Sequence, residues 1–347
     1  MYLKKILLAI VLIGLVVAGY FAYYVYAAMI APNTAFQNEE AYIYISTDAT
    51  YAHVREDLAP LLKDIDKFDA LAARKKYTTN IRPGRYVIKK DMSNNDIINS
   101  IRSDNRPIKL SFNNQETIMH LAGRIADQIE ADSVSIHNAM TDVDFLKKNN
   151  LNEDTALSMY IPNSYEFFWN TSAEGYRDRM LKEYNRFWTE KRLEKAKALN
   201  LSEEEVIVLA SIVQKETAKV DERPRVAGLY INRLKIGMPL QADPTVIFAM
   251  KRASGDFNMV IKRVLYKDLE LDSPYNTYKN RGLPPGPIAM PDISSIDAVL
   301  NYETHGYYYF VVNVENFGYH KFARTLAQHN RNKQEYVRWI NKQGINR

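Results

Sequence analysis

The chain begins with a long apolar run, which is followed by shorter strand-like and helix-like patterns. No charged residue occurs from Ile6 to Ile30, and about 20 apolar residues are enough to cross a bilayer. Two lysines precede this run, whereas the next Lys or Arg is Arg55, so the bulk of the chain is expected outside the cytoplasm. We predict a cytoplasmic tail at residues 1–5 and a single transmembrane helix at residues 6–29, in the cell membrane.

A cleaved signal peptide is the alternative interpretation of the apolar run. Val25-Tyr26-Ala27 resembles a small-residue cleavage site. The run is nevertheless longer than the apolar core of an ordinary signal peptide, and it is rich in tyrosines, which suit a membrane interface. These features favour a retained anchor, followed by a polar spacer at residues 30–40.

The remainder of the chain predicts a small mixed unit and then a larger, mostly helical one. The small unit covers residues 41–112, with strands expected at 42–45, 84–88 and 108–112 and helices at 51–63, 65–75 and 94–102. The larger unit covers residues 113–347, with helices expected at 117–129, 134–140, 173–199, 202–217, 222–234 and 326–342, proline-rich loops beyond residue 237 and a strand at 307–314. Strands and helices do not alternate regularly, so the predicted fold class is α+β.

Composition and charge exclude several classes of function. The chain has 46 Lys and Arg against 41 Asp and Glu, and these are scattered, so no nucleic-acid partner is expected. The absence of cysteine excludes a thiol nucleophile and cysteine-bound metal. No His-Glu-x-x-His, Gly-x-Ser-x-Gly or Ser-x-x-Lys motif occurs, so zinc and serine chemistry lack a signature. Carboxylate chemistry remains, with no metal or cofactor expected.

One carboxylate, Glu216, stands out by its place in the predicted helix 202–217. The helix opens with a capping box formed by Ser202 and Glu205. Its apolar stripe consists of Val206, Leu209 and Val213. Glu216 is the next position on this stripe, so burial should raise its pKa and keep it protonated near neutral pH, as a general acid requires. The spacing alone equally allows a frayed helix end or a buried ion pair.

Several segments of the chain, in the same order, resemble the signature of one family. They are Ala210-Ser-Ile-Val-Gln-Lys-Glu-Thr-Ala218 and Asn232-Arg-Leu-Lys-Ile-Gly-Met-Pro-Leu-Gln-Ala-Asp-Pro-Thr-Val246, with the shorter segments 275–278, 282–288 and 320–322. The family is that of the endolytic murein transglycosylases, also called YceG-like. Arg82-Pro-Gly-Arg-Tyr-Val87 lies in a unit that resembles a LysM module. With the N-terminal anchor, the resemblance covers nearly the whole chain.

The resemblance implies lytic cleavage of peptidoglycan glycan strands without a metal or cofactor. The β-1,4 bond between N-acetylmuramic acid and N-acetylglucosamine would be cut to give 1,6-anhydro-muramic acid ends, which would terminate growing strands. The Lys-Glu-Thr match implies Glu216 as the catalytic residue, whereas Gln214 stands where many members carry a second glutamate. Peptidoglycan synthases are the implied protein partners.

The resemblance also implies a set of substrate-binding residues. They are Gln241, Asp243, Asn276, Thr277, Tyr278 and His320. The alternatives are a turn before proline for Asp243, an Asx-type turn for residues 276–278 and ordinary hydrogen bonding for His320. Glu222 is expected to stabilise exposed N–H groups at the start of the next helix.

A catalytically inactive, membrane-tethered glycan-binding scaffold is the rival hypothesis. It would share the anchor and the LysM-like unit, which could bind glycan or act only as a spacer. The two hypotheses differ at Glu216, because a scaffold has no need of a buried acid that faces an open cleft.

Overall fold

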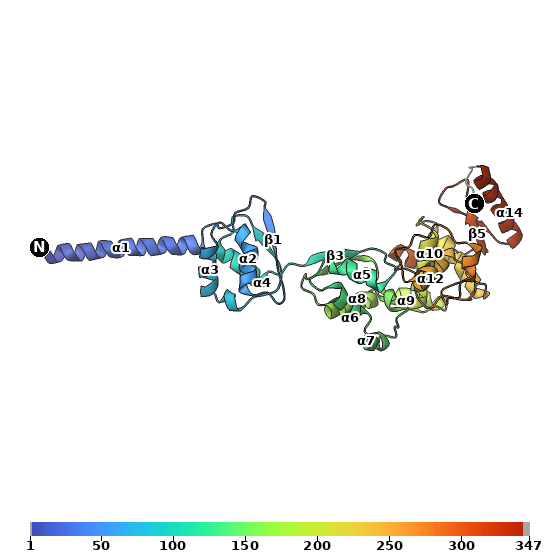
Figure 1. Ribbon diagram of the computed structural model, residues 1–347, viewed down its shortest axis with the longest axis horizontal. Helices are drawn as coiled ribbons and strands as arrows, with labels where there is room; N and C mark the ends of the chain where they lie inside the picture. The colour runs from blue at the N-terminus through green and yellow to red at the C-terminus, as the bar shows by residue number, and fades with distance from the viewer. Residues whose placement is uncertain (1, 343–347) are drawn as a thin grey trace. The chain divides into compact units, whose positions relative to one another are not determined.

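The computed structural model describes residues 2–342, which form two compact units (Figure 1). The N-terminal unit comprises the residues up to Leu110 together with Gln128–Ala131 and Tyr165–Ser172. The C-terminal unit comprises Ser111–Asp127, Asp132–Ser164 and the residues from Ala173 onward. Helices and strands are mixed in the chain, which confirms the expected combination of α and β structure.

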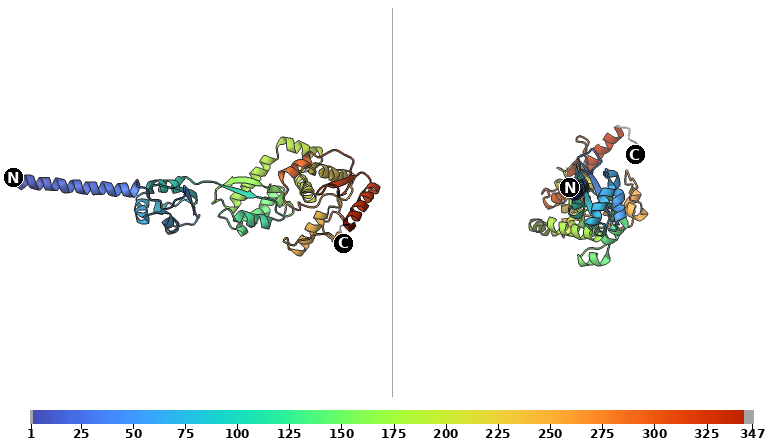
Figure 2. Two further views of the ribbon diagram at one scale, coloured as in Figure 1. Left: turned by 90° about the horizontal axis from the view of Figure 1, so that it is seen from above. Right: turned by 90° about the vertical axis from the view of Figure 1, so that its left-hand side faces the viewer.

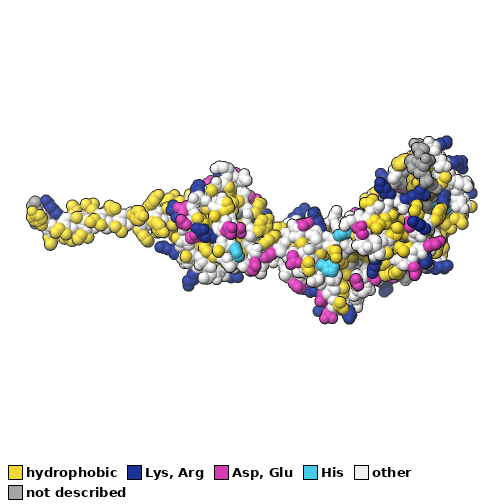
Figure 3. Space-filling model, viewed as in Figure 1, with side chains coloured by type: hydrophobic (Ala, Val, Ile, Leu, Met, Phe, Trp, Pro, Cys, Tyr) yellow, Lys and Arg dark blue, Asp and Glu magenta, His cyan; other side chains and the backbone are white. Residues whose placement is uncertain are grey.

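An N-terminal apolar helix, α1 (Tyr2–Met29), is present as predicted, although it begins four residues earlier than residue 6. Its 28 residues correspond to about 40 Å of helix, more than the hydrocarbon core of a bilayer. Its side chains are exposed along almost the whole length, and they form the band of apolar atoms at the N-terminal end in Figure 3. By length and composition, this helix is compatible with a single membrane span.

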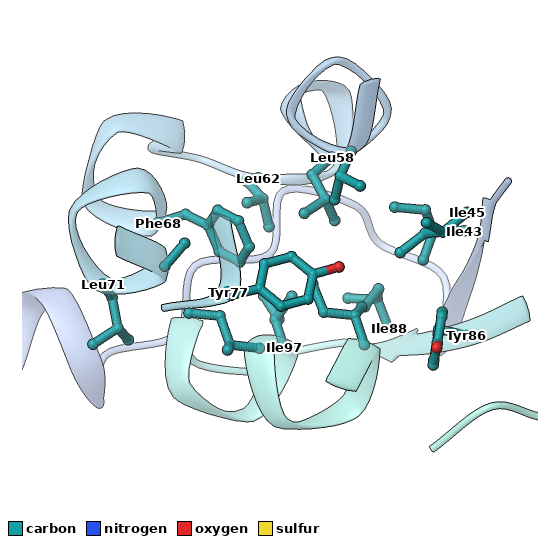
Figure 4. Close-up of a cluster of buried hydrophobic side chains, with 14 residues drawn as sticks. Ile43, Ile45, Leu58, Leu62, Phe68, Leu71, Tyr77, Tyr86, Ile88 and Ile97 are labelled. Atoms are coloured by element: carbon teal, nitrogen blue, oxygen red, sulfur yellow. The ribbon is translucent and has the colours of Figure 1, made fainter. Parts of the chain in front are cut away.

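The N-terminal unit has its own hydrophobic core beneath a two-stranded antiparallel sheet. Strands β1 (Glu40–Ile45) and β2 (Gly84–Lys89) pair with Ile43 opposite Tyr86. Three helices cover them, namely α2 (Tyr51–Leu58), α3 (Ile65–Arg74) and α4 (Asn94–Ser103). Alternation along the strands turns Ile43 and Ile45 inward, where they join Leu58, Phe68, Tyr77 and Ile97 (Figure 4).

Two expectations about this unit need adjustment. The helix expected at 51–63 ends at Leu58, and a 3-10 turn (Ala59–Leu61) follows it. Pro60 lies in this turn and has no N–H to continue the α-helix. The residues expected as a spacer at 30–40 lie against the unit, because Pro32 and Thr34 form β-bridges with Ser93 and Leu62.

The C-terminal unit is mostly helical. Its helices are α5 (Ile118–Ala126), α6 (Ser133–Met140), α7 (Val143–Lys148), α8 (Ala173–Phe187), α9 (Glu190–Ala198), α10 (Glu203–Glu216), α11 (Arg223–Lys235), α12 (Asp243–Ser254), α13 (Ile293–Leu300) and α14 (Leu326–Lys342). Short 3-10 turns of this unit lie at Ala156–Met159 and Tyr266–Glu270, and a further one at Tyr77–Thr79 belongs to the N-terminal unit. The strands β3 (Ile108–Phe112) and β4 (Asn163–Phe167) form one two-stranded sheet. The strands β5 (Tyr309–Val312) and β6 (His320–Ala323) form another, against which α14 packs (Figure 2).

Helix α10 is the central element of the C-terminal unit. It packs against α11, α12 and α13, and every residue from Val206 to Val213 is buried. A helix that is buried on all sides forms the middle of a core rather than its surface. The last turn of α10 therefore emerges from a rigid surrounding, which fixes the position of Glu216.

Some predictions for this unit are wrong. The single helix expected at 173–199 is two helices, α8 and α9, because the chain leaves the helical conformation at Trp188 and Thr189 caps the second one with extended backbone. The loop-rich region expected beyond residue 237 also contains two helices that were not predicted, α12 and α13. Pro244 lies in the first turn of α12, where a proline starts a helix rather than breaking it.

Candidate active site

Glu216 is the last residue of α10. The predicted capping box at the start of this helix is present, with Ser202 Oγ accepting from the N–H of Glu205 and the Glu205 carboxylate accepting from the N–H of Ser202. The helix ends because Thr217 takes an extended backbone conformation. Glu216 thus lies on the same helix face as the apolar stripe, and no further helical turn follows that could cover its side chain. Its side chain is partly exposed.

The surroundings of Glu216 favour its protonated form. The Tyr230 hydroxyl, on α11, donates a hydrogen bond of 2.6 Å to Glu216 Oε1. Burial raises the pKa of Glu216 to about 7, and the hydrogen bond from Tyr230 opposes this rise. The negative charge of Asp243 raises the pKa further, whereas His320 and Arg233 lower it. Near neutral pH, protonated and ionised forms of this carboxyl are both populated, and solvent can reach its exposed edge.

Asp243 and Tyr278 form a second hydrogen-bonded pair next to this carboxyl. The Tyr278 hydroxyl donates to Asp243 Oδ1 at 2.6 Å, and Asp243 is exposed in the first turn of α12, where the helix dipole favours an anion. Burial and the charges of Asp243 and Glu216 raise the pKa of Tyr278, so its hydroxyl stays protonated. Gln241 is exposed and has a left-handed backbone, with its N–H donating to the carbonyl of Thr277.

Asn276 and Thr277 hold the loop that carries Tyr278. The Asn276 amide donates to the carbonyls of Leu269 and Leu271, and its oxygen accepts from the N–H of Tyr278. The buried Thr277 hydroxyl accepts from the N–H of Ala242. Both side chains are buried and use their polar groups within the protein. This arrangement favours the turn interpretation of these two residues over direct contact with a substrate.

Glu222 is buried and bonded to neighbours that the sequence did not predict. It stands at the N-cap of α11, at the helix start as expected, but its side chain makes no hydrogen bond to the first N–H groups of the helix. Its carboxylate accepts from the Thr217 hydroxyl at 2.9 Å, the His320 N–H at 2.7 Å and His320 Nδ1 at 2.9 Å. His320 is therefore held at the start of β6 by a carboxylate from α11.

Gln214, two residues before the end of α10, has a structural role. Its Oε1 accepts from the N–H of Asp292 at 2.5 Å and from the Ser295 hydroxyl at 3.0 Å. These bonds join α10 to the start of α13. A glutamine performs this role without a charge, and its partners differ from those of Glu216.

A cavity elsewhere in the C-terminal unit does not include Glu216 among its lining residues. It has a volume of about 750 Å³ and lies at the opposite end of α10, where Ser202, Glu205 and Val208 line it. A smaller cavity of about 180 Å³ is lined by Lys215 and Pro244, the chain neighbours of Glu216 and Asp243. We assign the candidate site by its chemistry, because cavity size alone does not supply a proton donor.

No local pattern in the sequence marked Tyr230 as part of this site. It lies fourteen residues after Glu216 on another helix, and only the packing of α11 against α10 brings the two together. Among residues 2–342, no three His, Asp or Glu side chains gather in a way that could hold a metal ion. The fold and the site thus define a protein with a single partly buried carboxylic acid as its candidate reactive group.

The chain belongs to the YceG-like family, whose sequence model matches residues 43–335. It is 32% identical to the endolytic murein transglycosylase of Bacillus subtilis strain 168, over 81% of each chain. It is 26% identical to the endolytic murein transglycosylase of Streptococcus pneumoniae D39, over 92% of this chain and 62% of that longer one. The crystal structure of a YceG-like protein from Listeria monocytogenes matches with a TM-score of 0.57 and 27% identity, over 85% of this chain and 99% of that one.

Proposed function

We propose that this protein is an endolytic lytic transglycosylase of peptidoglycan, with Glu216 as its general acid and base. Family membership and the names of the relatives support the reaction class. The observation that carries the assignment of the residue is the carboxyl of Glu216, whose pKa is raised to about 7 by burial. An acid whose pKa is close to the working pH can both give and take a proton at useful rates.

The proposed reaction needs one carboxyl in two steps. Protonated Glu216 donates its proton to the glycosidic oxygen that links C1 of N-acetylmuramic acid to N-acetylglucosamine, and the C1–O bond breaks. The ionised carboxylate then takes the proton of the C6 hydroxyl of the muramic acid while the C6 oxygen bonds to C1. The product is a 1,6-anhydro ring, Glu216 is protonated again, and no water is consumed. A glycoside hydrolase would instead use a second carboxylate to attack C1 or activate water.

The neighbours of Glu216 suit both steps. Tyr230 donates to Oε1 and leaves Oε2 without this partner, so Oε2 is the oxygen we assign to the substrate. The same hydrogen bond stabilises the carboxylate after the first proton transfer. Asp243 provides a negative charge close to the positive charge that develops at C1. Gln241 and Tyr278 are exposed or partly exposed beside Asp243 and are proposed to bind sugar hydroxyls.

The remaining regions have proposed roles outside the reaction. We propose that α1 is a retained single-pass anchor with a cytoplasmic tail at residues 1–5, which places the other residues beyond the membrane. Residues 41–112 would form a LysM-like subdomain and residues 113–347 the catalytic domain. Peptidoglycan synthases are the proposed protein partners, because cleavage near a growing strand would set its length.

Cleavage by the full chain in detergent, with purified glycan strands as substrate, tests the proposal. The wild type should release products with 1,6-anhydro ends, whose mass lacks the water that hydrolysis adds. Glu216→Gln should lower the rate of cleavage by about 10²-fold or more, because the amide can neither donate nor accept the proton. Glu153→Gln, an exposed carboxylate outside the site, is the matched control and should cleave normally.

Other outcomes would lead to other conclusions. Products with reducing ends would identify a hydrolase, for which Asp243 is the next candidate as a water-activating base. Strand binding without cleavage by the wild type would favour the inactive scaffold. Full activity of Glu216→Gln would remove the assignment of the catalytic residue.

A further inference from the structure

A buried carboxylate and a histidine form a pair next to the candidate acid. The hydroxyl of Thr217, the residue after Glu216, donates a hydrogen bond of 2.9 Å to Glu222 Oε2. The same carboxylate accepts from the backbone N–H of His320 at 2.7 Å and lies 2.9 Å from His320 Nδ1. The Glu222 side chain is only 3% exposed, whereas that of His320 is 13% exposed. The imidazole therefore lies between a buried anion and the surface.

The charge state of Glu222 determines which ring nitrogen carries the proton. Burial opposes ionisation of Glu222, but the hydrogen bonds from His320 and Thr217 outweigh it, so the pKa of Glu222 lies below its ordinary value. An ionised carboxylate accepts hydrogen bonds and donates none. His320 Nδ1 must then carry the proton, and in the neutral ring Nε2 holds a free lone pair. Within residues 2–342, Nε2 makes no hydrogen bond.

Aromatic contacts connect this imidazole to Glu216. The His320 ring meets the Phe310 ring edge to face, with 4.7 Å between centroids. Phe310 in turn contacts Tyr230, with 6.2 Å between centroids, and the hydroxyl of Tyr230 bonds to Glu216. A second connection runs through Thr217, which follows Glu216 in the chain and donates a hydrogen bond to the same Glu222 carboxylate that holds His320. The hydrogen bond to Glu222 and the contact with Phe310 together orient the imidazole ring.

We propose that Nε2 of the neutral His320 ring accepts a hydrogen bond from an O–H or N–H group of the amino sugar bound at Glu216, and that Glu222 is the positioning residue that holds the proton of this ring on Nδ1. Hydroxyl and acetamido N–H groups are the donors that such a sugar offers. The inference rests on the proposed function and adds a specific contact to it. The structural alternative is that His320 serves only as a partner for the buried Glu222.

Two substitutions separate these roles. His320→Asn retains an N–H donor near the position of Nδ1, so Glu222 keeps its partner, but the group at the Nε2 position is lost. We expect the KM for glycan strands to rise by about tenfold with kcat little changed, because one hydrogen bond contributes about that factor to binding. The thermal unfolding midpoint should stay at the wild-type value. His137→Asn on α6 makes the same replacement elsewhere in the C-terminal unit and should leave KM unchanged.

Glu222→Gln tests the tautomer. A glutamine can turn its NH₂ group toward Nδ1, which favours the imidazole with its proton on Nε2 and removes the acceptor. The ¹⁵N spectrum of the ring should show the proton on Nδ1 in the wild type and on Nε2 in this variant, together with a raised KM. Conversely, wild-type KM in His320→Asn would overturn the proposal and leave His320 as a structural partner.

A binding measurement covers the case in which these variants fold poorly. The full chain with Glu216→Gln can bind strands without cutting them, so the Nε2 resonance of His320 can be followed while strands are added. A shift of this resonance on binding supports the contact, and an unchanged resonance in a protein that binds strands refutes it. Failure of the wild type to cleave strands would count against the proposed function instead. Cleavage by the wild type does not test whether His320 contacts the sugar, so the two failures can be distinguished.

Discussion

Replacing Glu216 by glutamine should stabilise the folded chain, and the gain should depend on pH. The ordinary pKa of the carboxyl is 4.5, and burial raises it to about 7 in the folded protein. The folded chain therefore binds this proton more tightly than the unfolded chain between these two values. Below pH 4.5 the raised pKa does not change the free energy of unfolding. Between pH 4.5 and 7 the wild type loses stability progressively, and above pH 7 this loss is constant. Glutamine does not ionise and avoids this cost.

The two pKa values set the size of the effect. Each unit of pKa corresponds to about 1.36 kcal/mol, so the gain above pH 7 has an upper limit of about 3 kcal/mol. Solvent at the exposed edge of the carboxyl reduces this value. For a unit of this size, about 3 kcal/mol corresponds to a rise in melting temperature of up to about 6 to 12 °C. The groups that face Glu216 and share in the effect are Tyr230, Asp243, His320 and Arg233.

Thermal unfolding of the full chain in detergent between pH 4 and 8.5 measures this gain. Glu216→Gln should match the wild type near pH 4 and exceed it increasingly up to about pH 7. Glu116→Gln is a control for which the opposite change, a loss of stability at neutral pH, is expected. Burial opposes ionisation of Glu116, but hydrogen bonds from Lys215 and Lys251 outweigh it and lower its pKa, so this carboxylate stabilises the fold at neutral pH. A difference between Glu216→Gln and the wild type that is the same at every pH would refute the burial argument.

Three further predictions test other parts of the molecule. Tyr230→Phe removes a hydrogen bond that lowers the pKa of Glu216, so the alkaline limb of the kcat/KM–pH profile should move to higher pH. Gly228→Ala would place a Cβ 2.2 Å from the carbonyl oxygen of Glu303 and should cost about 1 to 3 kcal/mol in thermal or urea unfolding, whereas Gly123→Ala, which meets no atom within 4 Å, should not. Removing residues 2–27 should shift the protein from the membrane to the soluble fraction while the 1,6-anhydro products stay the same.

The sequence by itself determined features that depend on neighbouring residues. The charge-free run predicted α1, and short runs of strand-forming residues predicted β1 and β2. The capping box and the stripe of α10 placed Glu216 at the end of an apolar face, which the structure confirms. Each of these features follows from helix or strand geometry over a few residues, so a local pattern is sufficient to find it. The family signature rests on the same kind of local information.

Only the tertiary structure decided how distant residues meet. The contact of Tyr230 with Glu216 depends on how α11 packs against α10, and the pairing of Glu222 with His320 joins residues 98 positions apart. Packing also directed the side chains of Asn276 and Thr277 inward, although their types suited a substrate. The pKa of Glu216 follows from the same cause, because desolvation depends on everything that surrounds a carboxyl and not on the helix that carries it.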